Sequence, residues 1–265
     1  MSNTALLAEY RVYLLGSDRR DGTIALRLRE IEKLAITHDL RTVTEDDLIA
    51  ILAQRRHQAP ETRKSMRASW RVFFEWAHRK GHRADDPTIG IRPIRIPARV
   101  PRIADDAAIL AALGTENPHY RAMILLGRGG WLRLSEIASL HTSSRTGRML
   151  TIRGKGGKER SVSINDEVAA ALDVLEPLQG PGYYFPGSRG RAYFHPISVN
   201  KIITRLTGYN PHALRHAGAT AAWRKTRDLR TIQDMLGHAS IRTTQIYVHT
   251  DDEQRRAVAD ASLLR

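Results

Sequence analysis

The sequence predicts a mainly α-helical protein of two domains, with one small antiparallel β-hairpin in the second domain. Apolar residues recur at helical spacing along most of the chain, and only residues 150–153 and 160–164 look like short strands. Three prolines within nine residues, Pro93, Pro97 and Pro101, forbid a regular helix there. The 265 residues are long enough for one large domain or two ordinary ones, and the proline segment favours two.

Residues 1–91 are predicted to form a helical domain that ends at a basic, extended linker, residues 92–102. Within this domain, residues 24–35 carry apolar residues at helical spacing. Thr44 fits the N-cap of a further helix, with Asp47 in the capping-box position.

The clearest helix of the first domain covers residues 62–80 and is expected to stop at Gly81. The apolar residues of this helix recur at the spacing that places them on one face, which is typical of core packing rather than of base stacking. They are Met66, Trp70, Phe73, Phe74 and Ala77. Four basic residues flank this face: Arg63, Lys64, Arg67 and Arg71. They are candidates for contact with DNA phosphates, and a solvated helix side is the alternative.

Residues 103–265 are predicted to form the second domain. Its two strands are joined by GlyLysGlyGlyLysGlu, which is typical of a hairpin. Asn165 can cap a helix that runs to about Leu175. Further helices are predicted at residues 105–113, 118–129, 134–140, 197–207, 212–223, 229–236, 241–248 and 252–263.

The charge balance indicates a polyanionic partner. Lys and Arg total 42 against 28 Asp and Glu, a formal net charge of +14, which suits nucleic acid or an anionic membrane. A solvated basic surface is the alternative. The absence of cysteine excludes disulfides, thiolate metal sites and cysteine nucleophiles. No apolar run approaches the ~20 residues of a membrane span, and no signal peptide is recognised, so a cytoplasmic protein without a membrane partner is expected.

Two segments of the second domain place a basic residue in an unusual position. One lies in an apolar segment, where burying a charge costs free energy, and the other lies at the tip of a tight turn. In TrpLeuArgLeuSerGluIle, residues 131–137, Arg133 lies in an apolar helix start and needs a partner. Taken alone, a structural pair with Glu136 would account for it. In ArgGlyLysGlyGlyLysGluArg, residues 153–160, glycines allow a lysine to sit at a sharp hairpin tip. Taken alone, this is a solvated basic turn.

Two later segments combine histidine with arginine or tyrosine. In HisAlaLeuArgHis, His212 and Arg215 lie three residues apart and share one helix face, which suits a phosphate clamp. In LeuGlyHis and the helix after it, a glycine-terminated helix presents His238, and Tyr247 follows nine residues later. Taken alone, the first pair would be two solvent-exposed polar side chains, and the tyrosine would belong to the core or to an interface.

Residues 100–250 resemble the tyrosine recombinases, or phage integrases. The resemblance lies in the order, spacing and residue types of five motifs: LeuArgLeuSerGlu, GlyLysGly, HisxxArgHis, LeuGlyHis and a terminal Tyr. Residues 1–91 resemble, more loosely, the helical core-binding domain of that family. The resemblance implies an integrase-type, two-domain DNA clamp acting on double-stranded DNA. Because the core-binding helices begin almost at residue 1, the chain resembles compact members without an arm-binding domain, namely Xer-type resolvases and small phage integrases.

The resemblance assigns six catalytic residues: Arg133, Lys155, His212, Arg215, His238 and Tyr247. It implies that the two arginines hold the non-bridging phosphate oxygens, and that Tyr247 attacks the scissile phosphate to leave a 3′-phosphotyrosyl link and a 5′-hydroxyl. In the same comparison Lys155 is the general acid, His212 assists proton transfer with the tyrosine and His238 hydrogen-bonds the phosphate. Glu136 is expected to orient His212 or Arg133. Lys158 is the local alternative to Lys155 and a DNA-binding candidate.

No group of Asp, Glu and His has a metal-ligand spacing that outranks this assignment, so no metal or cofactor is expected. The family resemblance implies four protomers that exchange strands through a Holliday junction, with residues 251–265 docking on a neighbour, or in the alternative packing on their own domain. Host or phage DNA-bending proteins would assist, on nucleoid DNA. Integration or excision of phage or mobile DNA is the expected role. The alternatives are Xer-type dimer resolution, a type IB topoisomerase and a non-catalytic DNA-binding regulator.

Overall fold

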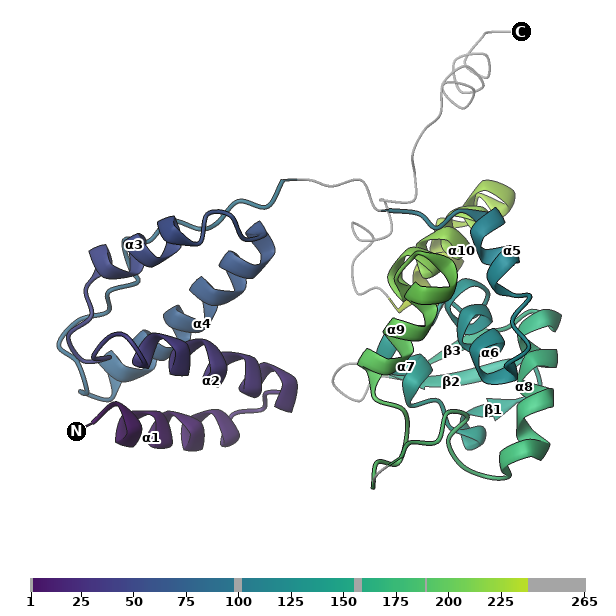
Figure 1. Cartoon of the computed structure of the whole chain (residues 1–265), viewed down its shortest axis with the longest axis horizontal. Coiled ribbons are helices and arrows are strands. Elements are labelled where there is room, and N and C mark those ends of the chain that lie inside the picture. The colour runs from purple at the N-terminus through teal and green to yellow at the C-terminus, as the bar shows by residue number, and fades with distance from the viewer. Residues whose placement is uncertain (1, 98–101, 155–158, 189, 238–265) are drawn as a thin grey trace, which may run out of the picture. The chain divides into compact units, whose positions relative to one another are not determined.

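The computed structural model describes residues 2–97, 102–154, 159–188 and 190–237. The chain divides into two compact units, Met1–Ala98 and Arg99–Arg265, and the division falls within the predicted linker. Residues 92–97, on the N-terminal side of that division, form neither helix nor strand. Figure 1 shows that the first unit is helical and that the second unit combines helices with a small sheet. The predicted fold class, mainly helical with a small antiparallel sheet, is confirmed.

The N-terminal unit consists of four helices, α1 (Asn3–Leu15), α2 (Asp21–Ala35), α3 (Glu45–Gln54) and α4 (Pro60–Arg79). The capping box predicted at Thr44 and Asp47 is present: Thr44 Oγ1 accepts the Asp47 amide at 3.2 Å, and the Asp47 carboxylate accepts the Thr44 amide at 2.9 Å. Gly81 adopts a φ of 75° just after α4, as expected of a helix stop. The apolar face of α4 lies in the core of the unit, as its packing period predicts.

The C-terminal unit begins with three helices, α5 (Asp106–Ala112), α6 (Pro118–Arg128) and α7 (Leu134–Ala138), and a short 3-10 turn, η1 (Thr142–Ser144). Three antiparallel strands follow in the order β1 (Arg145–Thr146), β2 (Met149–Arg153) and β3 (Glu159–Ser163). In the β2–β3 register, Leu150 pairs with Val162 and Arg153 with Glu159. Strand β1 was not predicted, because two residues are too few to show an alternating pattern.

The rest of the C-terminal unit is helical: α8 (Asp166–Gln179), α9 (Pro196–Thr207), α10 (Pro211–Thr226) and α11 (Leu229–Leu236). Asn165 caps α8 by accepting the Val168 amide at 3.0 Å, and α8 continues past the predicted end at Leu175. Helix α6 has six consecutive buried residues, from Ala122 to Gly127, and it packs against both α8 and α10. The predicted helices 241–248 and 252–263 lie outside the described residues. Within the described part of the chain, no helix is long and apolar enough to cross a membrane.

Candidate active site

The loop between α6 and α7 places Arg133 at the start of a helix. Trp131 adopts a φ of 51°, which is uncommon for a bulky residue and needs support from its surroundings. That support is a small apolar cluster in which Trp131 packs with Ala219, Ile232 and Leu236. Gly218 of α10 is also required, because a Cβ there would lie 2.5 Å from the Trp131 ring nitrogen. The strained loop is therefore held against α10 and α11.

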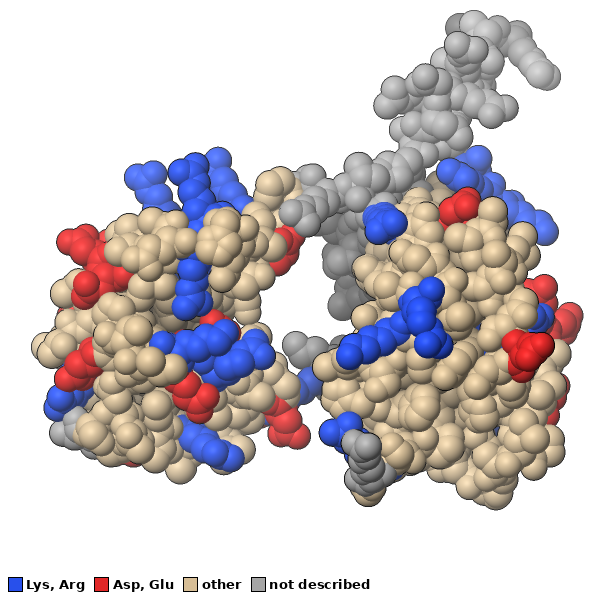
Figure 2. All heavy atoms as spheres, in the orientation of Figure 1, with Lys and Arg blue, Asp and Glu red and all other residues tan. Residues whose placement is uncertain are grey.

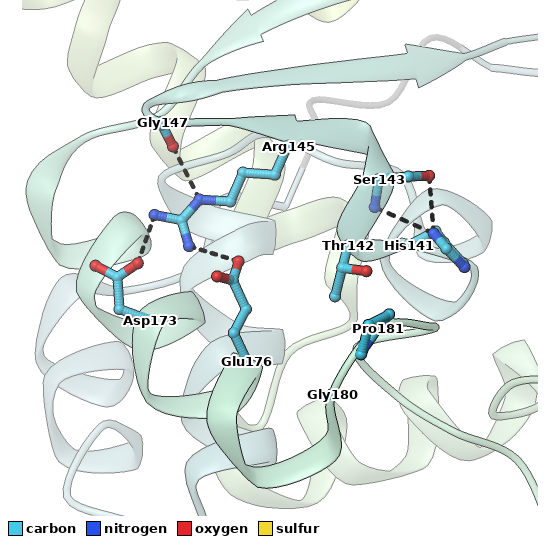
Figure 3. A pocket seen from close by; sticks show the side chains of 9 residues that line it. All are labelled: His141, Thr142, Ser143, Arg145, Gly147, Asp173, Glu176, Gly180 and Pro181. Carbon is cyan, nitrogen blue, oxygen red and sulfur yellow. Dashed lines mark hydrogen bonds and ion pairs between the residues drawn. The ribbon is translucent and has the colours of Figure 1, made fainter.

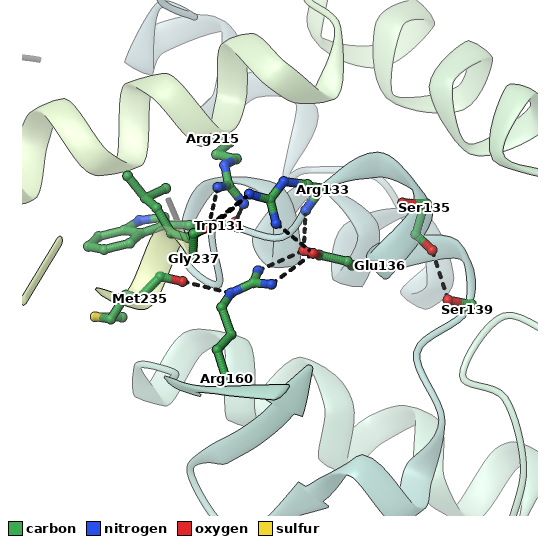
Figure 4. A network of polar contacts seen from close by, with 10 residues as sticks. Trp131, Arg133, Ser135, Glu136, Ser139, Arg160, Arg215, Met235 and Gly237 are labelled. Atoms are coloured by element: carbon green, nitrogen blue, oxygen red, sulfur yellow. Dashed lines mark hydrogen bonds and ion pairs between the residues drawn. The ribbon is translucent and has the colours of Figure 1, made fainter. Parts of the chain in front are cut away.

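Helix α10 carries His212 and Arg215 in its first two turns. Pro211 occupies the first helical position, and the Asn210 side chain caps the helix by accepting the Ala213 amide at 2.9 Å. Arg215 is only 1% exposed. Its guanidinium donates to the Trp131 carbonyl and, at 2.6 Å, to the Leu236 carbonyl. Arg215 is thus fixed between the α6–α7 loop and the end of α11 (Figure 4).

The guanidinium of Arg133 reaches the same carbonyl as Arg215. Its Nη2 donates to the Leu236 carbonyl at 3.1 Å and to the Gly237 carbonyl at 3.2 Å. The side chain of Arg133 remains 40% exposed, so this cation can still meet an incoming anion. Two arginines therefore converge where α11 ends, and His238 follows Gly237 directly in the sequence.

The Glu136 carboxylate accepts hydrogen bonds from two arginines, Arg133 and Arg160. This carboxylate accepts the Arg133 amide at 2.8 Å and Arg133 Nη1 at 3.0 Å. Arg160 of β3 donates to both Glu136 oxygens, at 2.8 and 2.7 Å. Burial by itself would raise the pKa of Glu136, but the hydrogen bonds from Arg160 and from the Arg133 amide outweigh it and lower the pKa to about 2. Glu136 is therefore a carboxylate at neutral pH.

Arg160 was not among the residues predicted for the site. It also donates to the Met235 carbonyl at 3.0 Å, so it joins β3 to the end of α11 (Figure 4). One signal for it was available in the sequence. Arg160 and Val162 are two residues apart on a strand, and Val162 is buried, so alternation places an arginine on the inward face.

His212 contacts a second histidine one helical turn along α10. The Nε2 atoms of His212 and His216 lie 2.7 Å apart, so one ring must donate and the other accept. Burial lowers the pKa of His212, and the positive charges of Arg215 and Arg133 lower it further. His212 is therefore held neutral beside both arginines. His216 had been given no role from the sequence.

The structure brings four predicted residues together: Arg133, Glu136, His212 and Arg215. The other predicted members of the site, Lys155, Lys158, His238 and Tyr247, and the tail 251–265 lie outside the described residues. No group of three or more His, Asp or Glu side chains suited to a metal ion occurs in the described ranges of the chain.

The four DNA-binding candidates of α4 differ in their surroundings. Lys64 and Arg71 are exposed, whereas Arg63 is half-buried. Arg67 is committed to the end of its own unit, because its Nε donates to the Ile91 carbonyl at 3.0 Å. Figure 2 shows Lys and Arg side chains gathered on the face of the N-terminal unit that is in view.

A surface pocket of about 650 Å³ lies elsewhere on the C-terminal unit, beside β1 and α8 (Figure 3). Its main charged residue, Arg145, is already matched by Asp173 at 2.7 Å and by Glu176 at 2.9 Å. None of the predicted catalytic residues lines this pocket. The arginine site at the end of α11, rather than this pocket, is therefore the candidate for chemistry.

Comparison with known proteins places the chain in one family. Residues 104–254 match the Phage integrase family. Tyrosine recombinase XerC of Xanthomonas campestris pv. campestris (strain B100) is 31% identical over 224 residues, which cover 78% of this chain and 70% of that protein.

Two solved structures share the fold. A λ integrase dimer bound to a COC′ core site matches 96% of this chain and 79% of that one, with a TM-score of 0.77 and 18% identity. A λ integrase tetramer bound to a Holliday junction matches 95% of this chain and 80% of that one, with a TM-score of 0.76 and 17% identity. The family identification made from the sequence motifs is confirmed: the chain belongs to the phage integrase family of tyrosine recombinases, which are site-specific DNA recombinases.

Proposed function

We propose that this recombinase integrates or excises phage or mobile DNA, and that Tyr247 is its nucleophile. The tyrosine oxygen attacks the scissile phosphorus, the bond from phosphorus to the 5′-oxygen breaks, and a 3′-phosphotyrosyl link remains. The energy of the broken bond is kept in the new one, so rejoining needs no ATP. The observation that carries the proposal is the convergence of Arg133 and Arg215 on the Leu236 carbonyl, one residue away from Gly237 and two from His238.

The arginine pair supplies what the reaction requires. Attack on a phosphodiester adds negative charge to the non-bridging oxygens in the transition state, and guanidinium groups stabilise that charge through bidentate hydrogen bonds. Both arginines donate to the carbonyl of Leu236, the last residue of α11, and Arg133 also donates to that of Gly237, the residue that caps the helix. Carbonyl oxygens at the C-terminal end of a helix carry partial negative charge. They can therefore hold two like-charged side chains close together before DNA binds.

Proton transfer is assigned to His212 and Lys155. His212 is neutral, since burial and the two arginines lower its pKa, so it can accept the proton that Tyr247 loses. Lys155 gives a proton to the departing 5′-oxygen. His238 donates a hydrogen bond to the phosphate.

Replacing Arg133 with alanine tests this function. We expect Arg133→Ala to reduce covalent cleavage of a nicked suicide substrate by ~10²–10³-fold, as when one oxyanion donor is removed, with little change in site binding. The matched control is Arg148→Ala, because Arg148 is an exposed arginine of the same unit that pairs with Asp166 at 2.9 Å. Equal cleavage by both variants would remove the arginine site from the mechanism.

We further propose that residues 1–91 form the core-binding domain, that residues 92–102 form the linker and that residues 103–265 form the catalytic domain. Beyond the predicted α4 residues, Arg27 and Arg19 support an anionic partner for the first domain. Burial, and then the positive charge of nearby Arg19, lower the pKa of Arg27. A phosphate would relieve this repulsion.

The salt dependence of DNA binding tests the two-domain proposal. Each phosphate contact should lower log affinity by ~0.9 per unit of log salt concentration. We expect Arg71→Ala to weaken binding and to reduce this slope by ~1, whereas Arg11→Ala, an exposed arginine of α1, should leave the slope unchanged. A slope that is flat in the unmodified protein, measured by fluorescence anisotropy between low and physiological salt, would contradict a clamp.

We propose a tetramer on DNA, in which residues 251–265 dock on a neighbouring protomer, assisted by DNA-bending proteins on nucleoid DNA. The likeness of the fold to a λ integrase tetramer bound to a Holliday junction supports the assembly. Xer-type resolution is the second candidate, and the 31% identity to a XerC recombinase favours it. Recombination assays on attachment sites and on chromosomal resolution sites distinguish these two roles.

A further inference from the structure

The contact between Glu136 and Arg133 poses an electrostatic problem for the proposed function. Glu136 is 9% exposed and ionised, and it touches the guanidinium that should face the scissile phosphate. A buried carboxylate paired with Arg133 alone would cancel the charge of that arginine. Arg133 can stabilise the negative charge that builds up on the phosphate only if its positive charge is not neutralised by a neighbouring carboxylate.

Arg160 resolves this problem through its own contacts with Glu136. Its two terminal nitrogens meet the two carboxylate oxygens at 2.8 and 2.7 Å, which is the fork geometry of a strong arginine–carboxylate pair. The side chains of Arg160 and Glu136 are 11% and 7% exposed, so water screens this pair little. The two arginines and one carboxylate together carry a net charge of +1, and the exposed member of the three is Arg133.

The same side chain fixes the end of α11. Arg160 Nε donates to the Met235 carbonyl at 3.0 Å, and Gly237 has a φ of 61°. A Cβ at position 237 would lie 2.7 Å from Arg160 Cδ, so a glycine is needed for the arginine to pass. Arg160 thus contacts the chain within three residues of His238, as well as the partner of Arg133.

We propose that Arg160 is a positioning residue for strand cleavage: it neutralises Glu136 and so leaves the charge of Arg133 available to the scissile phosphate. This rests on the proposed role of Arg133. Arg160 touches no reacting atom and acts through Glu136 and the end of α11.

The first test removes the charge of Arg160 and keeps most of its length. Arg160→Gln should lower single-turnover cleavage of the suicide substrate by ~10–100-fold, with unchanged DNA affinity. This is the range found for residues that orient metal ligands through hydrogen bonds, and Arg160 orients Arg133 through Glu136 in a comparable way. Arg160→Lys retains the charge but not the fork, so its loss should be smaller. The matched control is Arg145→Gln, which removes a 9% exposed arginine paired with two carboxylates of the same unit. Arg145→Gln should lower the melting temperature of the protein. Its cleavage rate, measured well below that temperature, should be unchanged.

The deciding measurement is the double variant Arg160→Gln/Glu136→Gln. If Glu136 cancels Arg133 once Arg160 is gone, neutralising Glu136 should restore cleavage by at least ~3-fold over Arg160→Gln, since contacting groups couple. If the double variant instead loses at least as much cleavage as the two single variants together, Arg160 only supports the fold, and the proposal is overturned. The proposed function is judged separately: an active Arg133→Ala would refute that function, whereas an inactive Arg133→Ala with a fully active Arg160→Gln refutes only the inference about Arg160.

Discussion

Replacing Tyr247 with phenylalanine is expected to abolish the covalent protein–DNA adduct while leaving binding to the recombination site intact. The ring is kept and only the hydroxyl is lost, so the variant should fold. No other atom of the side chain can attack phosphorus, so the loss should be complete rather than partial. A substrate nicked near the cleavage point should trap the unmodified protein as a covalent band on a denaturing gel, in the presence of EDTA.

Tyr209→Phe is the matched control for this experiment. Tyr209 is a half-buried tyrosine of the same unit, and its ring lies 4.6 Å from the guanidinium of Arg102. It should form the adduct at the normal rate. A covalent band that persists in Tyr247→Phe and disappears in Tyr209→Phe would move the nucleophile to residue 209.

The second large effect concerns Lys155 and the leaving oxygen. The 5′-oxygen departs as an alkoxide, whose conjugate acid has a pKa near that of water, ~15.7, so it needs a proton. Lys155→Ala should lose ~10²–10⁴-fold in cleavage of ordinary DNA, the usual contribution of a general acid. Sulfur in place of the bridging oxygen leaves as a thiolate, whose conjugate acid has a pKa of ~8.5 and needs no proton. Lys155→Ala should therefore be near the unmodified rate on the sulfur substrate.

Three variants make this result specific. Arg133→Ala and Arg215→Ala should stay impaired on the sulfur substrate, because charge still builds up on the non-bridging oxygens. Lys158→Ala should lose little on either substrate. Rescue of Lys158→Ala instead of Lys155→Ala would move the general acid to the second lysine. An inactive Lys155→Ala without rescue would mean that this lysine acts by charge or by DNA contact.

The helices were predictable because their signals are local. The capping residues Thr44, Asn165 and Asn210 each precede a helix and bond to it within three residues, so nearby sequence is enough to place the helix start. The buried face of α4 likewise follows from a 3.6-residue period. Strand β1 was missed because its two residues pair with β2 and carry no period of their own.

The spacing of the catalytic motifs also lies in the sequence, and it was enough to identify the family. The side-chain contacts between those motifs could not be predicted from the sequence. Glu136 was expected to orient His212 or Arg133, and its contacts with Arg133 and Arg160 depend on a strand that lies 24 residues further along the chain. Likewise, the contact of His212 with His216 depends on ring orientations that a three- or four-residue spacing does not set.

The sequence by itself determined the mainly helical fold, the caps and the family motifs, because periodicity, capping and residue type act over a few neighbouring positions. Only the tertiary structure decided which charges meet. Arg133 and the Leu236 carbonyl are 103 residues apart in the chain and 3.1 Å apart in space, and Arg160 reaches Met235 across 75 residues. Coulomb energy depends on distance and burial rather than on sequence separation, so the partner of each arginine emerges only when β3, α10 and α11 pack around the α6–α7 loop.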